Sequence, residues 1–378
     1  MHADLETLFG DDDRGRLSRR QLLQGLAMGS AAALLPRTSF AQGQCGGARA
    51  GTPECDTTPA KLPFAPTGWK TVLLDHLSCQ VVDYSKEAAY YQALMNWNIR
   101  SDDGKQAMLD VGDWGGLAIR GGYVAPPPPP ALPASATPGS GPGGPGGGQG
   151  GPRAPRNAAF DGFCWGIDRW DAKTVESELT KRGLSPVADN HGDFQSFHVK
   201  DPDGFDLQIS NGSRKNRRTT PAAGKTAAAP PFESPKWQTV WLDHISFEVS
   251  NYKETVAFYT ALLGWTPGQD EGSQSQCRIG DVGDIIIRRG FAGRPGAAPA
   301  PAQTPAPRRA SIGHISFGIA AFEPDQVKAE LTKRGLTARE DTGGRGDIHT
   351  AAYKSYHTTT PNGYDLQISA TTKASRGA

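Results

Sequence analysis

Two stretches of the chain share one pattern of apolar and polar positions. Residues 73–97 (LLDHLSCQVVDYSKEAAYYQALMNW) and 241–265 (WLDHISFEVSNYKETVAFYTALLGW) both begin with an apolar run that contains an Asp-His pair. A polar break follows, and then a segment whose apolar residues recur three and four positions apart, as Val256, Tyr259 and Leu263 do. The apolar run is typical of a buried strand, and the spacing is typical of an amphipathic helix. The pattern therefore predicts a strand–helix unit that occurs twice.

A second unit also occurs twice. The sequence ELTKRGL stands at 178–184 and again at 330–336, and PDGFDLQIS at 202–210 matches PNGYDLQIS at 361–369. Each unit is predicted to form a strand, a helix and two or three short strands, in four segments at about 69–123, 158–211, 237–291 and 310–370. One βαβββ unit cannot bury both faces of its sheet, so we expect the units to pair and to curl their strands around a cleft.

Composition marks the domain boundaries. Three stretches are rich in Pro, Gly and Ala and cannot build a core, at 126–155, 219–231 and 293–309. The first and the last interrupt a pair of units at equivalent places, and the middle one separates the pairs. We therefore expect an α+β protein made of tandem βαβββ units, with an N-terminal domain at 69–211, a linker at 212–236 and a C-terminal domain at 237–370.

Residues 1–41 have the layout of an export signal. Arg19 and Arg20 precede a short run rich in Ala, Leu and Gly with no acidic residue in it, and small residues precede a cleavage site after Ala41. The SRRQLL sequence resembles the twin-arginine signal, which implies the twin-arginine export machinery as a partner and a periplasmic or secreted location. No other apolar run approaches the roughly 20 residues that span a bilayer, so we expect no membrane association after cleavage.

Charge and cysteine usage narrow the class of protein. Lys and Arg number 40 against 39 Asp and Glu, which argues against a nucleic-acid-binding surface and favours a small-molecule partner. Cys45 and Cys55 could close a small loop in an oxidising compartment, whereas Cys79, Cys164 and Cys277 fall in strand-like runs and are expected in the core. No pair has the spacing of a thiolate zinc site.

The paired βαβββ units, the Asp-His pair on the first strand and the terminal DPDGFDLQI resemble the vicinal oxygen chelate superfamily. That superfamily includes glyoxalase I, ring-cleaving extradiol dioxygenases, methylmalonyl-CoA epimerase and antibiotic-resistance proteins such as the bleomycin-binding type. The resemblance covers residues 69–370 outside the Pro/Gly-rich stretches. It implies a metal-binding cleft, and it is compatible with several chemistries.

Carried onto the C-terminal domain, the resemblance implies a divalent ion (Fe²⁺, Mn²⁺, Zn²⁺ or Ni²⁺) held by His244, His314 and Gln367. Two imidazoles and one oxygen ligand leave open positions for substrate. Gln367 is neutral at a place where the dioxygenases carry a carboxylate. The alternative for these residues is that they are buried polar groups satisfied by hydrogen bonds. In the N-terminal domain the equivalent residues are His76, Gly162 and Gln208, so a second imidazole is missing and a degenerate site is expected.

The same resemblance implies catalytic roles for His349 and His357, because the HTAAYKSYHTTTPNGYDLQ segment follows the extradiol spacing. An imidazole there could act as acid, base or hydrogen-bond donor near neutral pH. The alternative is ordinary histidines on a strand surface. Arg288 and Arg289, with Arg120 as their counterpart in the N-terminal domain, could pair with a substrate carboxylate or enolate, or face solvent.

The sequence therefore indicates an exported, metal-dependent enzyme that acts on a small substrate with adjacent oxygens. Two enzymatic versions stay open, an extradiol-type dioxygenase and a glyoxalase- or epimerase-type lyase or isomerase. A non-catalytic periplasmic protein that binds small molecules in the same cleft is the alternative from another class.

Overall fold

The computed structural model describes residues 56–124, 157–219, 228–290, 308–344 and 346–376. The expected export signal at 1–41, Cys45 and Cys55 lie outside these ranges. So do the stretch at 126–155 and most of the other two Pro/Gly-rich stretches.

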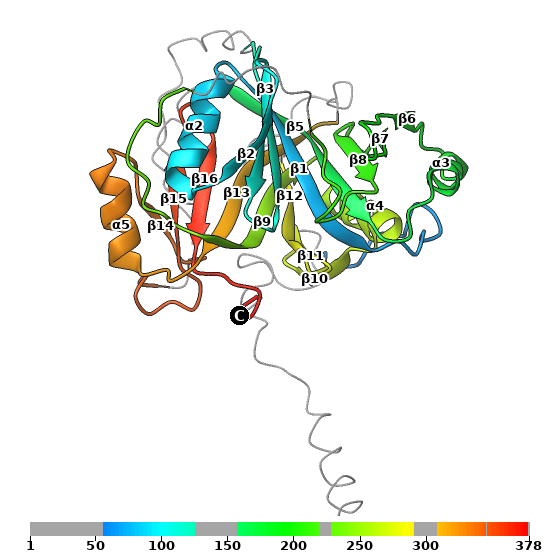
Figure 1. Cartoon of the computed structure of the whole chain (residues 1–378). Helices are drawn as coiled ribbons and strands as arrows, with labels where there is room; N and C mark the ends of the chain where they lie inside the picture. Colours follow the sequence, from blue (N-terminus) through cyan, green and yellow to red (C-terminus); the bar gives the residue numbers. More distant parts are fainter. Residues whose placement is uncertain (1–55, 125–156, 220–227, 291–307, 345, 377–378) are drawn as a thin grey trace, which may run out of the picture.

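The N-terminal half forms one eight-stranded mixed sheet (Figure 1), with strand order β2-β3-β4-β1-β5-β8-β7-β6. Its elements are β1 (Thr71–Val81), α2 (Tyr84–Met95), β2 (Asn98–Asp102), β3 (Gln106–Val111), β4 (Gly115–Arg120), β5 (Ala158–Ile167), α3 (Ala172–Lys181), β6 (Val187–Ala188), β7 (Ser196–Lys200) and β8 (Asp206–Ser210).

The C-terminal half repeats this arrangement in a second sheet, with the order β10-β11-β12-β9-β13-β16-β15-β14. Its elements are β9 (Thr239–Val249), α4 (Tyr252–Leu263), β10 (Thr266–Asp270), β11 (Gln274–Ile279), β12 (Gly283–Arg289), β13 (Ala310–Ile319), α5 (Pro324–Lys333), β14 (Arg339–Asp341), β15 (Ser355–Thr359) and β16 (Asp365–Ser369).

The first strands of the two units in each half pair with one another and join the units into one sheet. β1 runs antiparallel to β5, and β9 runs antiparallel to β13. Each first strand also pairs in parallel with the last strand of its own unit, as β9 does with β12 and β13 with β16. The predicted α+β fold of tandem, paired βαβββ units is confirmed.

The polar breaks in the sequence are helix N-caps. The side chains of Asp83, Asp171 and Asn251 accept hydrogen bonds from the backbone N–H groups of the first helical turns of α2, α3 and α4. Such caps satisfy N–H groups that have no partner inside the helix. The same residues that interrupt the apolar pattern therefore start the helices.

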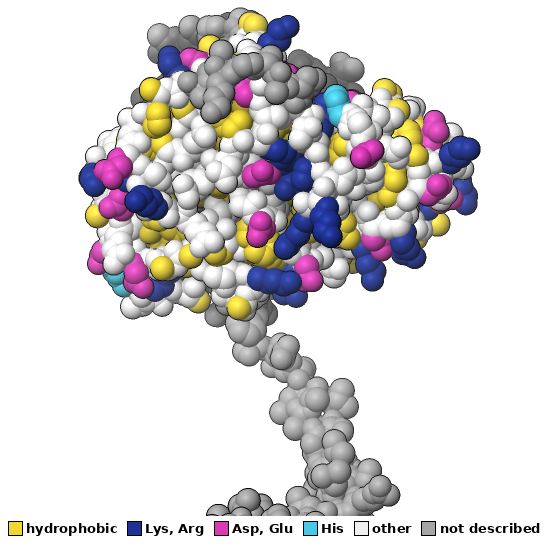
Figure 2. Space-filling view, in the orientation of Figure 1, with side chains coloured by type: hydrophobic (Ala, Val, Ile, Leu, Met, Phe, Trp, Pro, Cys, Tyr) yellow, Lys and Arg dark blue, Asp and Glu magenta, His cyan; other side chains and the backbone are white. Residues whose placement is uncertain are grey.

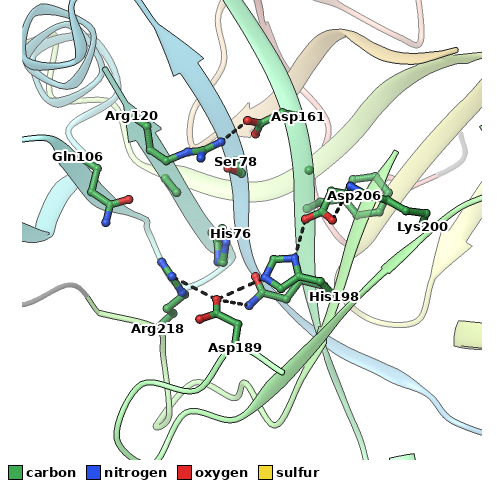
Figure 3. A pocket seen from close by; sticks show the side chains of 14 residues that line it. His76, Ser78, Gln106, Arg120, Asp161, Asp189, His198, Lys200, Asp206 and Arg218 are labelled. Atoms are coloured by element: carbon green, nitrogen blue, oxygen red, sulfur yellow. Dashed lines mark hydrogen bonds and ion pairs between the residues drawn. The ribbon is translucent and has the colours of Figure 1, made fainter. Parts of the chain in front are cut away.

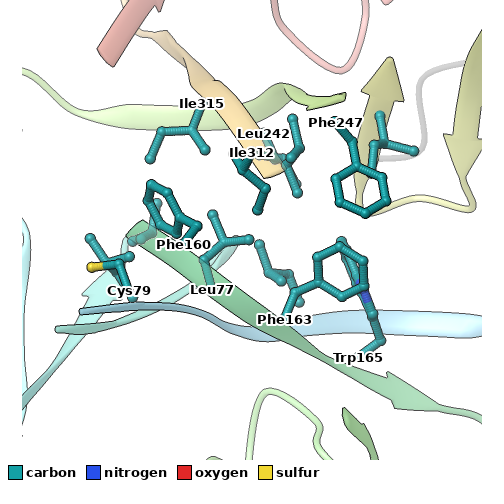
Figure 4. Close-up of a cluster of buried hydrophobic side chains, with 14 of the residues drawn as sticks. Leu77, Cys79, Phe160, Phe163, Trp165, Leu242, Phe247, Ile312 and Ile315 are labelled. Atoms are coloured by element: carbon teal, nitrogen blue, oxygen red, sulfur yellow. The ribbon is translucent and has the colours of Figure 1, made fainter. Parts of the chain in front are cut away.

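The two sheets share one hydrophobic core. In Figure 4, Leu77, Phe163 and Trp165 of the N-terminal sheet face Leu242, Phe247 and Ile312 of the C-terminal sheet. The rings of Phe163 and Phe247 lie 5.7 Å apart between centroids. The expected small core cysteines, Cys79, Cys164 and Cys277, are buried as free thiols.

Helices α2 and α4 tie each half to the other reciprocally. Glu87 of α2 accepts hydrogen bonds from the backbone and side chain of Asn362, in the turn between β15 and β16. Tyr259 of α4 donates a hydrogen bond to Asp201, in the equivalent turn between β7 and β8. Helices α3 and α5 lie at opposite ends of the molecule (Figure 1). The halves thus pack as one body.

The described surface carries mixed charge. Basic and acidic side chains are interspersed over the face shown in Figure 2, as the near-zero net charge leads one to expect. Within the described ranges, no helix is both long and apolar enough to cross a bilayer.

Candidate metal centre in the C-terminal cleft

Strand alternation places two histidines on the cleft face of the C-terminal sheet. Along β9, Ile245 and Phe247 belong to the core, and His244 and Ser246 lie on the opposite face. On β13, Ile315 belongs to the core and the neighbouring His314 faces away from it. Because β9 and β13 are adjacent antiparallel strands, the two imidazoles meet on the face of the sheet opposite the core.

The imidazoles of His244 and His314 converge on one point. Their Nε2 atoms are 3.0 Å apart, and their ring centroids are 5.1 Å apart. Two nitrogens that bind one ion at right angles, each at about 2.1 Å, lie about 3.0 Å apart. The pair therefore fits two neighbouring metal ligands, and it also fits an imidazole–imidazole hydrogen bond when no ion lies between them.

The electrostatics favour a neutral imidazole at His314. Burial, and then the neighbouring His244 and His357, lower the pKa of His314 well below its usual value. A neutral ring keeps a lone pair for a metal. Asp243 Oδ2 lies 3.5 Å from His244 Nδ1 and accepts hydrogen bonds from Ser316 and Tyr353, so it is itself fixed. A carboxylate behind a ligand histidine orients the ring in this manner in many metal sites.

Gln367 offers an oxygen without a partner. Its Nε2 donates to Ser355 Oγ at 2.7 Å, Tyr353 OH at 2.9 Å and Asp341 Oδ2 at 3.3 Å. An ionised carboxylate can only accept, so Asp341 fixes which end of the amide is nitrogen. Gln367 Oε1 is left buried with no hydrogen-bond partner. A buried acceptor without a donor is costly, and a cation would satisfy it.

His357 is held between two carboxylates. Its Nδ1 lies 2.8 Å from Asp365 Oδ1 and its Nε2 lies 3.1 Å from Asp341 Oδ2. Burial opposes protonation, but these two hydrogen bonds outweigh it and raise the pKa of His357. The hydrogen bond from His357 in turn lowers the pKa of Asp341 to about 2. The rings of His357 and His314 are 5.1 Å apart between centroids, so an imidazole with a raised pKa adjoins the candidate ligands.

His349 is not brought to this cluster. It precedes β15 in an irregular segment, its side chain is 54 % exposed, and its Nε2 lies 3.7 Å from Asp325 of α5. The structure thus unites four of the five residues that the sequence indicated, namely His244, His314, His357 and Gln367.

Comparison with known proteins gives the family of this region. Residues 241–368 match the family model described as the Glyoxalase/Bleomycin resistance protein/Dioxygenase superfamily. The C-terminal half is a domain of this superfamily. A comparison with curated protein sequences found no match.

Solved structures share the fold over both halves. An Mn(II)-bound glyoxalase from Novosphingobium aromaticivorans is 14 % identical, with 80 % of this chain and 82 % of that chain covered and a TM-score of 0.51. The E323L mutant of homoprotocatechuate 2,3-dioxygenase from Brevibacterium fuscum is 15 % identical, with 83 % and 74 % covered and a TM-score of 0.51. The 2,3-dioxygenase LapB from Pseudomonas sp. KL28 is 14 % identical, with 79 % and 92 % covered and the same score. At these identities the likeness concerns the fold.

The cleft of the N-terminal half differs from that of the superfamily domain. It is a cavity of about 530 Å³. Figure 3 shows His76 and Arg218 among the side chains that line it. Gly162 stands where β13 carries His314, since both lie opposite the Asp that begins the last strand. Arg218 enters from the segment after β8, and its Nη2 lies 3.3 Å from Asp189 Oδ2. A fixed arginine occupies this cleft, and Gly162 offers no imidazole at the place of His314.

One polar network is nonetheless the same in both halves. His198 lies between Asp206 and Asp189, and Gln208 donates to Asp189 and Ser196, just as the C-terminal residues do. Sequence reasoning missed the aspartates Asp189 and Asp341, which bind both the histidine and the glutamine. The available signal was their separation of 152 positions, the same as that of the two ELTKRGL copies.

A second group of potential ligands lies below the N-terminal cleft. Atoms of Asp75, His76 and Cys164 lie within 4.8 Å of one another. The Asp75 carboxylate already accepts from His76 Nδ1, Arg217 Nε and the Arg218 backbone. Burial raises the pKa of the Cys164 thiol well above its usual value, so the sulfur stays protonated. This group is less suited to a metal than the C-terminal trio.

Proposed function

We propose that this protein is a divalent-metal-dependent enzyme of the glyoxalase/dioxygenase type that acts on a small substrate with vicinal oxygens in its C-terminal cleft. His244, His314 and Gln367 are the proposed ligands. The observation that carries the proposal is the 3.0 Å separation of the two Nε2 atoms, together with the unpartnered, buried Oε1 of Gln367. Gln367 pairs with Ser316 of β13, which in turn pairs with His244 of β9. The Mn(II)-bound glyoxalase with the same fold lends support.

A bound divalent ion would supply Lewis-acid polarisation of a substrate carbonyl or diolate. The protein's own residues have separate tasks. Asp243 and Asp341 hold the ligand side chains in place through the hydrogen bonds described above. His357 is the proposed proton donor or acceptor, because it adjoins His314 and two carboxylates bind its ring nitrogens and raise its pKa. His349, exposed and remote from the cluster, has no part in this proposal.

The metal content of the purified protein tests the proposal. We expect about one divalent ion per chain in the wild type and in His76→Ala, which removes the N-terminal counterpart. We expect loss of the ion in His244→Ala and in His314→Ala. Metal that is absent from the wild type, or retained in both C-terminal variants, would refute the proposal and favour a metal-independent protein that only binds small molecules.

The reaction class is resolved by oxygen uptake. Iron in the site together with O₂ consumption on catechols supports the dioxygenase version. Zinc, nickel or manganese without O₂ uptake supports the lyase or isomerase version. A neutral Gln367 in place of a carboxylate leaves the ligand set without negative charge, which suits chemistry that keeps one metal oxidation state. We therefore favour the second version.

We also propose that residues 1–41 direct export through the twin-arginine machinery, so that the mature protein works in the periplasm or outside the cell. The support is the paired Arg19 and Arg20 before an apolar run without acidic residues. Cell fractionation of the wild type and of a chain with both arginines changed to lysine tests this. Equal amounts of both in the periplasmic fraction would contradict it.

A further inference from the structure

We infer that the substrate of the C-terminal cleft is an anion whose carboxylate, or a similar oxyanion, pairs with Arg288. This inference rests on the proposed function, since the anionic group belongs to the molecule that binds at His244 and His314. It adds the class of substrate and a residue that selects it.

Arg288 is a partly buried cation without an anion. It lies on β12, and its Nε is inaccessible to solvent and has no hydrogen-bond partner. Among the described residues, no carboxylate lies within 4.0 Å of its guanidinium nitrogens, although most other arginines of the cleft walls have such a partner. Burial accordingly lowers the pKa of Arg288. Leaving a buried charge unpaired is unfavourable, and a ligand anion would relieve it.

In the N-terminal half the equivalent arginine has a carboxylate partner. Arg120 occupies the same place on β4, and its guanidinium is hydrogen bonded to the carboxylate of Asp161 on β5. The position of Asp161 in β13 is held by Gly313, one residue before His314. The duplicated fold thus carries the same arginine twice. Asp161 pairs with it in the N-terminal copy, whereas in the C-terminal copy Glu248 stands beside it and no described carboxylate forms a salt bridge with it.

A carboxylate adjoins Arg288 on the next strand but forms no salt bridge with it among the described residues. Glu248 is the register partner of Arg288 on β9. Its Oε1 lies beside Gly313, 2.9 Å from where a Cβ would stand, and it makes no salt bridge with Arg288 in the described structure. Glu271 and Asp341 are also close enough to influence the pKa of Arg288, but neither is within salt-bridge distance. The guanidinium therefore remains available to a ligand.

Arg288 is at a suitable distance from the proposed metal ligands. Ser246 pairs with His314 across the sheet and with Ile286 of β12, and Glu248 and Arg288 form the next pair on the same face. Arg288 thus lies two strands, roughly 10 Å, across the sheet from His314 and roughly 7 Å further along it, and its long side chain covers part of that distance. A compact substrate that binds at His244 and His314 through adjacent oxygens can thus reach the guanidinium with a carboxylate on its far side. The bidentate fork of arginine suits that group.

Two catechols that differ by one carboxylate test this inference. The mature protein is loaded with Zn²⁺, which undergoes no redox change, and the Kd values of 3,4-dihydroxybenzoate and catechol are measured by calorimetry. We expect the wild type to prefer the carboxylate compound at least about tenfold, as a charge-assisted hydrogen-bonded pair predicts. We expect Arg288→Gln to reduce this preference to less than about threefold.

Gly313→Asp supplies a second variant that keeps the arginine. It restores the carboxylate of the N-terminal copy, and the contact it creates is with the mobile end of Glu248. We expect it to remove the preference as Arg288→Gln does, because either the introduced carboxylate or the displaced Glu248 then neutralises the guanidinium. Arg120→Gln, the matched change in the other half, should leave the preference intact.

The outcomes separate this inference from the proposed function. Zinc-loaded protein that binds both catechols equally, or an Arg288→Gln variant that keeps the tenfold preference, overturns the anionic subsite and leaves the metal site standing. Protein that takes up no zinc, or that binds neither compound when loaded, counts against both.

Discussion

The Nε2 atoms of His244 and His314 lie 3.0 Å apart, on two antiparallel strands that come from different units of the repeat. Only the pairing of those two units brings the two imidazoles together. In the N-terminal half His76 stands in the same place, but Gly162 replaces the second imidazole. The two halves therefore share one fold, but only the C-terminal half brings two imidazoles together at this place.

Removal of the Gln367 side chain should weaken metal binding. Its Oε1 is the unpartnered, buried oxygen, so Gln367→Ala takes away one of three proposed ligands. We expect the affinity for Zn²⁺ to fall at least about tenfold, measured by competition with a chromogenic chelator. Gln208→Ala, the same change in the N-terminal cleft, is the control and should leave the affinity unchanged. Equal affinities for both variants would exclude Gln367 as a ligand.

Asp341 should act as a positioning residue. It accepts hydrogen bonds from Gln367 Nε2 and from His357 Nε2. Asp341→Asn removes a carboxylate that raises the pKa of His357, so that pKa should fall, and metal affinity should fall by about 10–100-fold. The proton NMR titration of His357 and the chelator competition measure the two effects. A merely structural role would leave the His357 titration where it is.

The raised pKa of His357 has a consequence for stability. A histidine whose pKa is higher in the folded state stabilises that state below its unfolded pKa, and the contribution is lost as the pH rises through the folded value. We therefore expect His357→Gln to lower the free energy of unfolding more at pH 6 than at pH 9. Urea titrations at both pH values measure this. A loss that is greater at pH 9 would have the wrong sign.

Asp201 lies at the contact between the halves. It should make the stability of the folded state depend on pH in a second, more acidic range. Burial raises its pKa to about 6, although the N–H groups of Phe205 and Asp203 and the hydroxyl of Tyr259 favour the charged form. The folded state then binds more protons than the unfolded state between about pH 4 and 6, so stability falls as the pH rises through that window.

Asp201→Asn keeps an acceptor for the backbone N–H groups and cannot ionise. The free energy of unfolding of this variant, relative to the wild type, should rise by on the order of 2–3 kcal/mol between about pH 4 and pH 7. Urea titration at each pH gives the values. A difference between the two proteins that does not change with pH would show that Asp201 titrates normally.

Much of the fold could be predicted from the sequence because the strand, N-cap and helix patterns all indicate the same repeated unit. The repeated Asp-His strands, the polar N-caps and the two ELTKRGL helices specify four similar units, and such units must pair to bury their sheets. His244 and His314 were accessible to prediction for the same reason, since a residue on a first strand has a fixed place in the cleft.

Other site residues depend on contacts that a linear pattern does not contain. Asp341 ends a three-residue edge strand without a motif, and only its hydrogen bonds to Gln367 and His357 reveal its place. The spacing of His349 from Gln367 along the chain suggests a place in the site. An irregular segment separates His349 from β15, so the strand register does not fix where its side chain lies. The sequence leaves open whether Arg288 faces solvent or a ligand. Only the structure shows that Gly313 stands at the position of Asp161, the partner of Arg120 in the other half.

Anomalous diffraction from crystals soaked in a divalent metal tests the central claim most directly. The account predicts one strong peak per chain, between His244 Nε2, His314 Nε2 and Gln367 Oε1, at about 2.0–2.2 Å from each. It predicts no comparable peak at His76 or at Asp75 and Cys164. A C-terminal cleft without a peak, or a peak that lies only in the N-terminal half, would contradict it.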